Sequence, residues 1–380
     1  MFFEISSNTN SNYPNHHFIK DKILNCDDGW VKIEKNNIIY FYKGYYESND
    51  TLEYILDVNV FNIFGNFILI SFGESIEIKH SYHRSFPLYY NEYSNVVTNL
   101  KNDKMKFVDI DKFISISDKI NLIKINQSYE LIIPEDFDNK INLLISIIVN
   151  KVNFLKKEHN IKLYLSGGVD TALIHSLLIN QKIEFELILG EHFEYNYFFC
   201  KNYSVLKNYW SYSKQIHNFN YDCFLVSGVL GDEVFLRSPY EFALFCYSRN
   251  LSTLNLLDEN DHHFLYFKRE PAIKTFTNIQ RNKHIFKDIV FNKDKFLNHL
   301  IQYSLTDYQH WHFGKTLTVT PFLDERILKI MYSFDDEIIF KQLKDSFISK
   351  LIIERLNKES LKYISKYKND NSFENLVSLL

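Results

Sequence analysis

The sequence predicts an α+β region followed by an α/β region with a helical C-terminal part. Residues 1–125 contain consecutive short strand-like runs without helices between them, a pattern typical of packed antiparallel sheets. From residue 161 onward, strand-like and helix-like segments alternate, as they do around a parallel sheet. A chain of 380 residues can bury two cores. We therefore expect one domain over residues 1–132 and a second over residues 133–380.

The first region reads as a series of hairpins. Residues 30–46 form two strand-like runs with Asn36 and Asn37 as the turn, and residues 58–72 form another pair about Gly65 and Asn66. Residues 76–90 continue the pattern. A linker at 125–138, which contains Pro134 and the acidic pair Glu135-Asp136, precedes an expected amphipathic helix at 139–157.

Composition and charge narrow the functional classes. A net charge of −4 and a pI near 6.4 give no overall electrostatic reason to bind nucleic acid or an anionic membrane. The four cysteines show no zinc-ligand spacing, which fits a reduced cytoplasmic protein. No signal peptide opens the chain, and the most apolar segment, residues 141–155, is interrupted by polar residues. We expect no membrane span.

The strongest chemical signal is a glycine turn between a strand and a helix. Four of the residues at 161–165 are apolar (all except Lys162), SGGVDT follows, and an amphipathic run begins at Ala172. Adjacent glycines let backbone N–H groups approach an anion, and the helix N-terminus is partly positive. Asp170 would repel phosphate unless a cation lay between them, so it indicates a Mg²⁺ ligand. The turn has neither the Walker nor the dinucleotide pattern; the alternative is an ordinary βα turn.

A second turn of this kind follows at residues 224–235, FLVSGVLGDEVF. It consists of a buried-type strand, then glycines, then Asp232 and Glu233. Because open parallel sheets bind ligands at the carboxyl ends of their strands, Asp170 and Asp232 could hold one Mg²⁺–pyrophosphate. The alternative for Asp232 and Glu233 is an exposed turn or a helix N-cap.

These motifs resemble those of one enzyme family. SGGVDT resembles the pyrophosphate loop of the ATP pyrophosphatase superfamily, and SGVLGDEVF is similar to TGEGADELF of asparagine synthetases. Residues 319–324, VTPFLD, resemble that family's V-R-x-P-F-L-D segment, and residues 365–368 stand where the family has a late Arg-x-Lys. The chain is therefore asparagine synthetase-like, close in type to β-lactam synthetase and lasso-peptide cyclase.

The first region shows a partial resemblance of its own. Arg84 and residues 87–90, PLYY, match part of a segment in class II glutamine amidotransferase domains. The implied fold is a degenerate amidotransferase-like (Ntn) β-sandwich followed by an adenine-nucleotide α-hydrolase-like parallel-sheet domain. The family's nucleophile is a Cys directly after Met1, whereas this chain has Phe2. Glutaminase activity is therefore expected to be absent.

The resemblance also implies roles for individual residues. The ATP-binding positions are Leu165, Ser166, Gly167, Gly168, Asp170, Thr171, Leu189, Gly228 and Asp232. Asp170 and Asp232 would be the Mg²⁺ ligands, and Lys368, or else Lys344, would stabilise the departing pyrophosphate. For either lysine the alternative is a solvated surface cation. Asp324 could simply cap a helix that begins at Glu325.

The acceptor side of the site departs from the family. Val229 replaces a Glu that is a candidate general base in asparagine synthetases, and residues 236–240, LRSPY, replace the usual Gly-Gly-Tyr. Tyr308 or His310 could supply the base, because a His near pKa 6.5 suits proton transfer at neutral pH. Alternatively these side chains lie on a helix surface.

The expected function is ATP-dependent amide formation. A small-molecule or peptide carboxylate would be adenylylated with release of pyrophosphate, and an amine would then attack, without glutaminase activity in this chain. The alternatives are a non-catalytic ATP-binding scaffold and an ammonia-dependent asparagine synthetase. Nucleic-acid and membrane partners are disfavoured, and a homodimer stays open.

Overall fold

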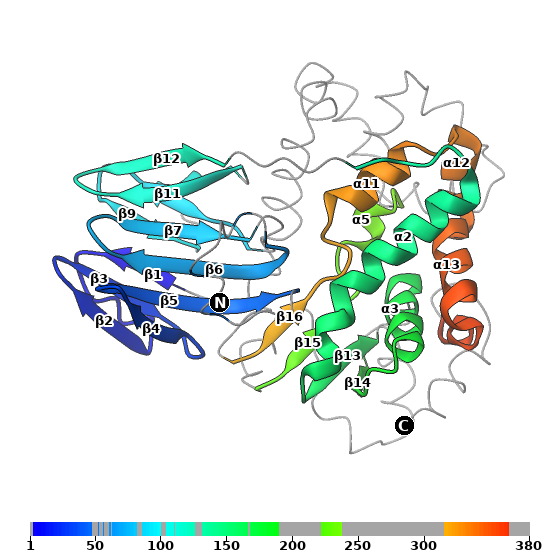
Figure 1. Cartoon of the computed structure of the whole chain (residues 1–380), viewed down its shortest axis with the longest axis horizontal. Coiled ribbons are helices and arrows are strands. Elements are labelled where there is room, and N and C mark those ends of the chain that lie inside the picture. Colours follow the sequence, from blue (N-terminus) through cyan, green and yellow to red (C-terminus); the bar gives the residue numbers. More distant parts are fainter. Residues whose placement is uncertain are drawn as a thin grey trace.

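The described part of the chain forms two antiparallel sheets and one parallel sheet (Figure 1). The computed structural model describes residues 3–47, 63–81, 86–99, 104–109, 111–125, 131–165, 168–189, 222–237 and 315–364, together with the single residues 52, 56 and 61. The antiparallel sheets come first in the chain and the parallel sheet second. This mixed architecture confirms the coarse fold prediction. The predicted boundary at residue 132 falls between β12 and α2.

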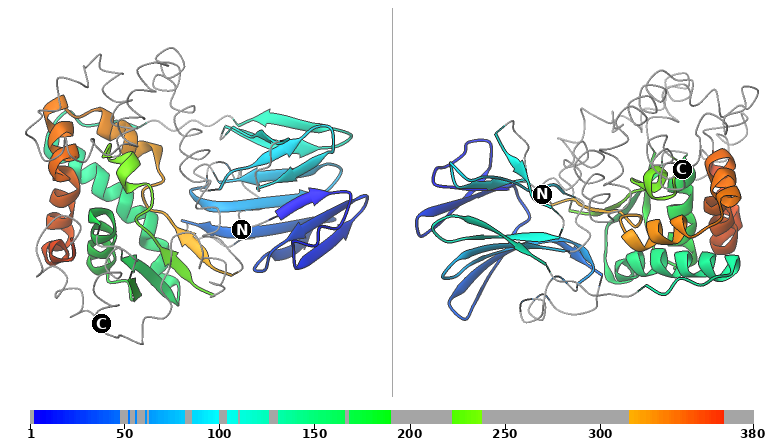
Figure 2. Two further views of the ribbon diagram at one scale, coloured as in Figure 1. Left: turned by 180° about the vertical axis from the view of Figure 1, so that it is seen from behind. Right: turned by 90° about the horizontal axis from the view of Figure 1, so that it is seen from above.

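The antiparallel half consists of two six-stranded sheets that lie face to face (Figure 2). One sheet has the order β10-β8-β9-β1-β3-β2, with strands β1 (Phe3–Ser6), β2 (Asn15–Ile19), β3 (Lys22–Cys26), β8 (Tyr89–Asn91), β9 (Val96–Thr98) and β10 (Lys106–Phe107). The other has the order β12-β11-β7-β6-β5-β4, with strands β4 (Val31–Lys35), β5 (Ile38–Tyr46), β6 (Gly65–Phe72), β7 (Ile76–His80), β11 (Lys112–Ile116) and β12 (Ile120–Lys124). Apolar side chains from both sheets, among them Phe3, Leu24, Phe41, Ile70 and Ile114, form the core of this sandwich.

The hairpin predicted at Asn36 and Asn37 is confirmed. These residues have φ of 53° and 61°, and β4 pairs with β5 directly across them, Lys35 opposite Ile38. A two-residue hairpin turn needs positive φ at both central positions, and Asn tolerates that conformation better than most residues.

The turn predicted at Gly65 and Asn66 is wrong, because both residues lie inside β6. They pair with Tyr46 and Tyr45 of β5. Gly65 is required for close backbone approach: a Cβ there would lie 2.4 Å from the carbonyl oxygen of Tyr45, and φ is +154°. Gly44, on the facing strand, is crowded in the same way, since its Cβ would lie 2.2 Å from the carbonyl oxygen of Asn66.

The second half is built on a parallel sheet of order β14-β13-β15-β16. All three of its strand pairings are parallel. Its strands are β13 (Ile161–Leu165), β14 (Glu186–Leu189), β15 (Phe224–Val226) and β16 (Leu317–Val319). The described helices are α2 (Phe137–Val152), η2 (Asn153–Lys157), α3 (Val169–Asn180), α5 (Gly231–Val234), α11 (Glu325–Tyr332), α12 (Asp336–Asp345), α13 (Phe347–Asn357) and η7 (Lys358–Tyr363). None of these helices is both long enough and apolar enough to cross a membrane.

Capping residues set where the helices of this half begin. Asp136 accepts a hydrogen bond from the backbone N–H of Asn139 at 2.8 Å, so α2 starts two residues before the predicted position. Asp324 accepts from the N–H of Arg326 at 2.8 Å, which confirms that it caps a helix beginning at Glu325. The helix predicted from Ala172 starts three residues earlier, at Val169.

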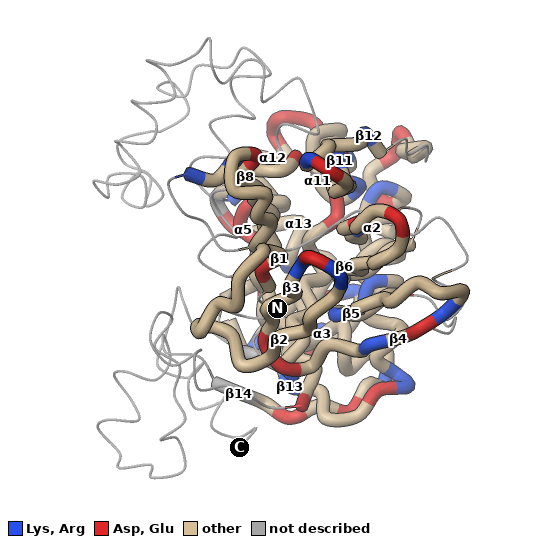
Figure 3. The backbone as a smooth tube through the Cα atoms, turned by 90° about the vertical axis from the view of Figure 1, so that its left-hand side faces the viewer, with Lys and Arg blue, Asp and Glu red and all other residues tan. Residues whose placement is uncertain are grey.

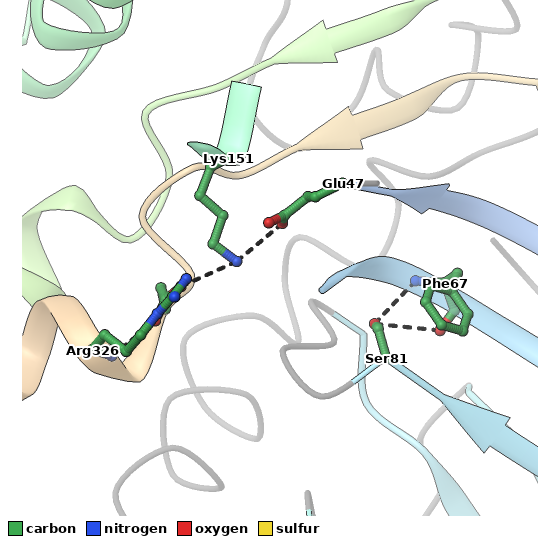
Figure 4. Close-up of polar contacts among 6 residues, drawn as sticks. Glu47, Phe67, Ser81, Lys151 and Arg326 are labelled. Carbon is green, nitrogen blue, oxygen red and sulfur yellow. Dashed lines mark hydrogen bonds and ion pairs between the residues drawn. The ribbon is translucent and has the colours of Figure 1, made fainter. Parts of the chain in front are cut away.

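A buried ion network joins the sandwich to the parallel-sheet half (Figure 4). Nζ of Lys151, from α2, lies 3.0 Å from Oε1 of Glu47 at the end of β5 and 3.2 Å from Oδ2 of Asp324. Arg326 donates from Nε to Oδ1 of Asp324 at 2.9 Å. The side chains of Lys151 and Asp324 are 3% and 0% exposed. Phe64 lies against both cations, with its ring centroid 5.3 Å from Nζ of Lys151 and 4.5 Å from Cζ of Arg326.

We predict that Lys151→Ala lowers the free energy of unfolding by about 3–5 kcal/mol, because it removes a cation shared by two buried carboxylates. Urea denaturation followed by circular dichroism measures the change. Lys350→Ala, at an exposed position of α13, is the matched control and is expected to stay within about 0.5 kcal/mol of wild type. Equal stability of the two variants would contradict the role of the network.

Candidate functional site

The two glycine-containing turns lie at the same edge of the parallel sheet. β13 and β15 are adjacent and parallel, with Leu163 opposite Val226. The first turn connects β13 to α3, and the second connects β15 to α5. The carboxyl ends of adjacent parallel strands meet at one edge, where open α/β sheets bind their ligands.

The second turn packs directly on the first. A Cβ on Gly228 would lie 2.9 Å from Cγ2 of Thr171, and a Cβ on Gly231 would lie 2.2 Å from Cγ of Asp170. Real Cβ atoms do not approach other atoms so closely, so both positions require glycine. Between them, Leu230 adopts the left-handed conformation with φ of 68° and caps α5.

This packing brings the two predicted metal ligands onto one cation. Nη2 of Arg237 contacts Oδ1 of Asp170 and lies 3.0 Å from Oδ1 of Asp232. The Asp170 and Arg237 side chains are 13% and 7% exposed, whereas that of Asp232 is 46% exposed. Figure 3 marks the acidic residues of α5 along the backbone. The oxygens of both acids therefore face a single positive charge.

Glu233, next to Asp232 in α5, adds to the negative charge of the site. Burial, reinforced by the charge of Asp232, raises its pKa from 4.5 to about 7. A carboxyl group with this pKa changes protonation state near neutral pH.

Asp170 and Asp232 suit a Mg²⁺ ion that is also bound by phosphate. The part of the chain that the structure describes contains no group of three or more His, Cys, Asp or Glu side chains that could hold a metal. Mg²⁺ does not need such a group, because it is commonly held by one or two carboxylates plus substrate phosphates and water. Since Asp170 and Asp232 already converge on one cationic nitrogen, the two side chains suit a metal that arrives with a phosphate ligand.

The first turn leads into the N-terminus of α3. Gly168 is the residue before this helix and accepts hydrogen bonds from the N–H of Ala172 and from Oγ1 of Thr171, at 3.1 and 3.0 Å. The hydroxyl of Thr171, a predicted ATP-binding position, thus donates to a carbonyl here. Ser166 and Gly167, the other predicted members of this turn, lie outside the described residues.

Three further predicted ATP-binding positions, Leu165, Leu189 and Gly228, flank the turns. Leu165 and Leu189 pair opposite each other at the carboxyl ends of β13 and β14, and Gly228 follows β15. The Leu165 side chain is fully buried, so only its backbone could face a ligand.

Of the remaining predicted residues, Lys344 lies in the last turn of α12, and Tyr308, His310 and Lys368 fall outside the described residues. Within the first region, Arg84 is also outside them, and the PLYY segment leads into β8 with its Leu88 and Tyr89 side chains buried.

Sequence reasoning missed Arg237. It appeared there only as part of the LRSPY segment that replaces Gly-Gly-Tyr, without a role. The available signal was a cationic residue in place of glycine, five positions after a predicted metal ligand. Nothing in the local pattern indicated that this side chain would contact Asp170, which is 67 residues away in the sequence.

A scan against models of protein families and a search of curated proteins find no match to this chain.

We predict that Gly231→Ala destabilises the protein by about 1–3 kcal/mol, because the added methyl group overlaps Asp170 and forces the two turns apart. Thermal and urea unfolding measure the effect. Gly73→Ala is the matched control: a Cβ there would make only an ordinary 3.6 Å contact with Ile38, and neither glycine has a positive φ. If both variants lose the same stability, the two turns do not need the close contact.

Glu233 makes a pH-dependent contribution to stability. Its folded-state pKa, about 7, is raised above the ordinary value of 4.5, so the unfolded chain ionises first as the pH rises. The contribution of Glu233 to stability is therefore full below pH 4.5 and is lost as the pH rises from 4.5 through 7, by an upper limit of about 3 kcal/mol.

We predict that Glu233→Gln removes this fall, so that the variant gains stability relative to wild type between pH 4.5 and 8 and equals it in acid. Urea denaturation across that range measures the difference. Glu354→Gln, at an exposed position of α13, should follow the wild-type curve. If the free energy of unfolding of Glu233→Gln changed with pH in the same way as that of wild type, the raised pKa of Glu233 would be contradicted.

Proposed function

We propose that this protein is an ATP-dependent synthetase that forms amide bonds. A carboxylate substrate attacks the α-phosphate of ATP, pyrophosphate leaves, and an amine then displaces AMP from the acyl-adenylate. The observation that carries the proposal is the contact between two turns at the carboxyl edge of a parallel sheet, which directs Asp170 and Asp232 at one cation. The proposed fold of this half is adenine-nucleotide α-hydrolase-like.

We assign the residues of the two turns different roles in binding the nucleotide. The N-terminus of α3, with the glycines before it, binds the pyrophosphate through backbone N–H groups and the helix dipole. Asp170 and Asp232 hold Mg²⁺, which supplies the positive charge that balances the phosphates. Lys368 or Lys344 is the proposed partner of the leaving pyrophosphate. The backbones of Leu165, Leu189 and Gly228 border the adenine.

The acceptor chemistry follows from the first region. We propose that the sandwich is a degenerate amidotransferase-like (Ntn) domain that releases no ammonia. Cys26 supports this role, because burial within β3 raises its thiol pKa to about 12 and keeps it from acting as a nucleophile. The amine is therefore expected on a small molecule or peptide, with His310 or Tyr308 as the proposed base.

A second candidate function, a non-catalytic ATP-binding scaffold, is favoured by one observation. Arg237 lies between the two acids at the place where a metal ion is needed. A protein in which this contact is permanent would bind nucleotide without cleaving it.

The test of the synthetase is nucleotide product analysis. The purified protein is incubated with ATP and Mg²⁺ against pools of carboxylic acids and amines. We predict AMP and pyrophosphate with one pool, and a loss of at least about 100-fold in Asp170→Asn and in Asp232→Asn, because each loses a charge needed around the phosphates. Asp118→Asn, in an exposed turn of the sandwich, should retain wild-type activity.

The other possible results distinguish the synthetase from the scaffold or contradict the adenylation mechanism. ADP in place of AMP would overturn the adenylation mechanism. ATP binding without turnover in every pool would support the scaffold, and loss of activity in Asp118→Asn would show that the Asp170 and Asp232 effects are not specific to the site.

A further inference from the structure

The positively charged guanidinium of Arg237 lies between the two proposed metal ligands, Asp170 and Asp232. One of its terminal nitrogens contacts Asp170 and lies 3.0 Å from an oxygen of Asp232. Both contacts are charge-assisted, and that to Asp170 is largely shielded from solvent. The guanidinium therefore satisfies the two carboxylates that would otherwise repel each other across the contact between the turns.

Arg237 is held both through its backbone and through its guanidinium. Its backbone N–H donates to the carbonyl oxygen of Asp232 at 2.7 Å, and the preceding residue, Leu236, turns the chain with φ of 56°. Its second terminal nitrogen, Nη1, donates to Oγ of Ser346 at 3.2 Å. Ser346 lies at the junction of α12 and α13 and is itself in the left-handed conformation.

Rotation of the Arg237 side chain would move this charge away from the acids without moving the backbone. The backbone bond to Asp232 does not involve the guanidinium, and Ser346 is held through a side-chain hydrogen bond. A polyphosphate at the adjacent turn would offer Arg237 a stronger partner, because guanidinium binds phosphate oxygens in a bidentate manner.

We propose that Arg237 is a resident cation that competes with divalent metal for Asp170 and Asp232, and that the phosphates of a nucleotide draw it away so that the metal enters. The nucleotide part of this inference rests on the proposed function; the competition between Arg237 and the metal does not. The consequence is that metal and nucleotide bind cooperatively, each raising the affinity for the other by the same factor.

The experiment measures Mn²⁺ binding to the full chain by electron paramagnetic resonance of the free ion. Without nucleotide, wild type is expected to bind Mn²⁺ weakly, and Arg237→Gln at least about tenfold more tightly, because the competing charge is gone. Arg237→Lys keeps the charge and should bind about as weakly as wild type. Asp170→Asn in the Arg237→Gln background should abolish the gain.

A second arm adds a non-hydrolysable ATP analogue. In wild type the analogue should tighten Mn²⁺ binding by a larger factor than in Arg237→Gln, since only wild type has a cation to displace. Arg355→Gln is the matched control: it removes an arginine that pairs with Asp138 on the helical surface and should leave both affinities unchanged. Circular dichroism and the unfolding midpoint establish that each variant is folded.

Several results would overturn the inference. Equal Mn²⁺ affinity in wild type and Arg237→Gln would show that Arg237 does not compete with the metal, and so would equal affinity in Arg237→Lys and Arg237→Gln. An equal effect of the analogue in wild type and Arg237→Gln would refute the release by phosphate. If the analogue binds to no variant while the Mn²⁺ gain is present, the proposed function fails and the competition stands.

Discussion

The parallel pairing of β13 with β15 is the constraint on which the candidate site depends. It places two turns, separated by tens of residues in the chain, at the same edge of one sheet. The turns then pack so closely that Gly228 and Gly231 leave no room for a side chain against Thr171 and Asp170. The sheet sets the distance between the two strands. Because the glycines have no Cβ atom, the backbones of the two turns can come into direct contact at that distance.

Close packing of these turns concentrates acidic groups. Asp170, Asp232 and Glu233 come together where solvent is partly excluded, which raises the pKa of Glu233 and requires a cation between the other two. Arg237 supplies that charge in the protein alone. Its contact with Ser346 extends the site to the junction of α12 and α13.

A second group of buried charges connects the two halves. Lys151 is shared between Glu47 of the sandwich and Asp324, which also caps α11. Asp324 therefore has two roles that depend on the same carboxylate: one starts a helix and the other holds the sandwich against the parallel-sheet half. Beside it, Tyr45 of β5 stacks on Phe154 with ring centroids 4.9 Å apart. Loss of the sandwich would expose this apolar surface together with the charged cluster, so the sandwich has a structural role.

The sequence by itself determined the features that depend on neighbouring residues. The Asn36–Asn37 hairpin, the cap at Asp324, the order of strand, glycine turn and helix at Asp170, and the strand and glycine turn before Asp232 all follow from local backbone preferences. The tertiary structure decided the rest. Gly65 looked like a turn residue because the sequence does not reveal that a facing strand will approach its backbone. Likewise, the contacts of Arg237 with Asp170 and of Lys151 with Glu47 span 67 and 104 residues. Such contacts exist only once the chain has folded, because the packing of helices and strands decides which distant side chains share a buried position.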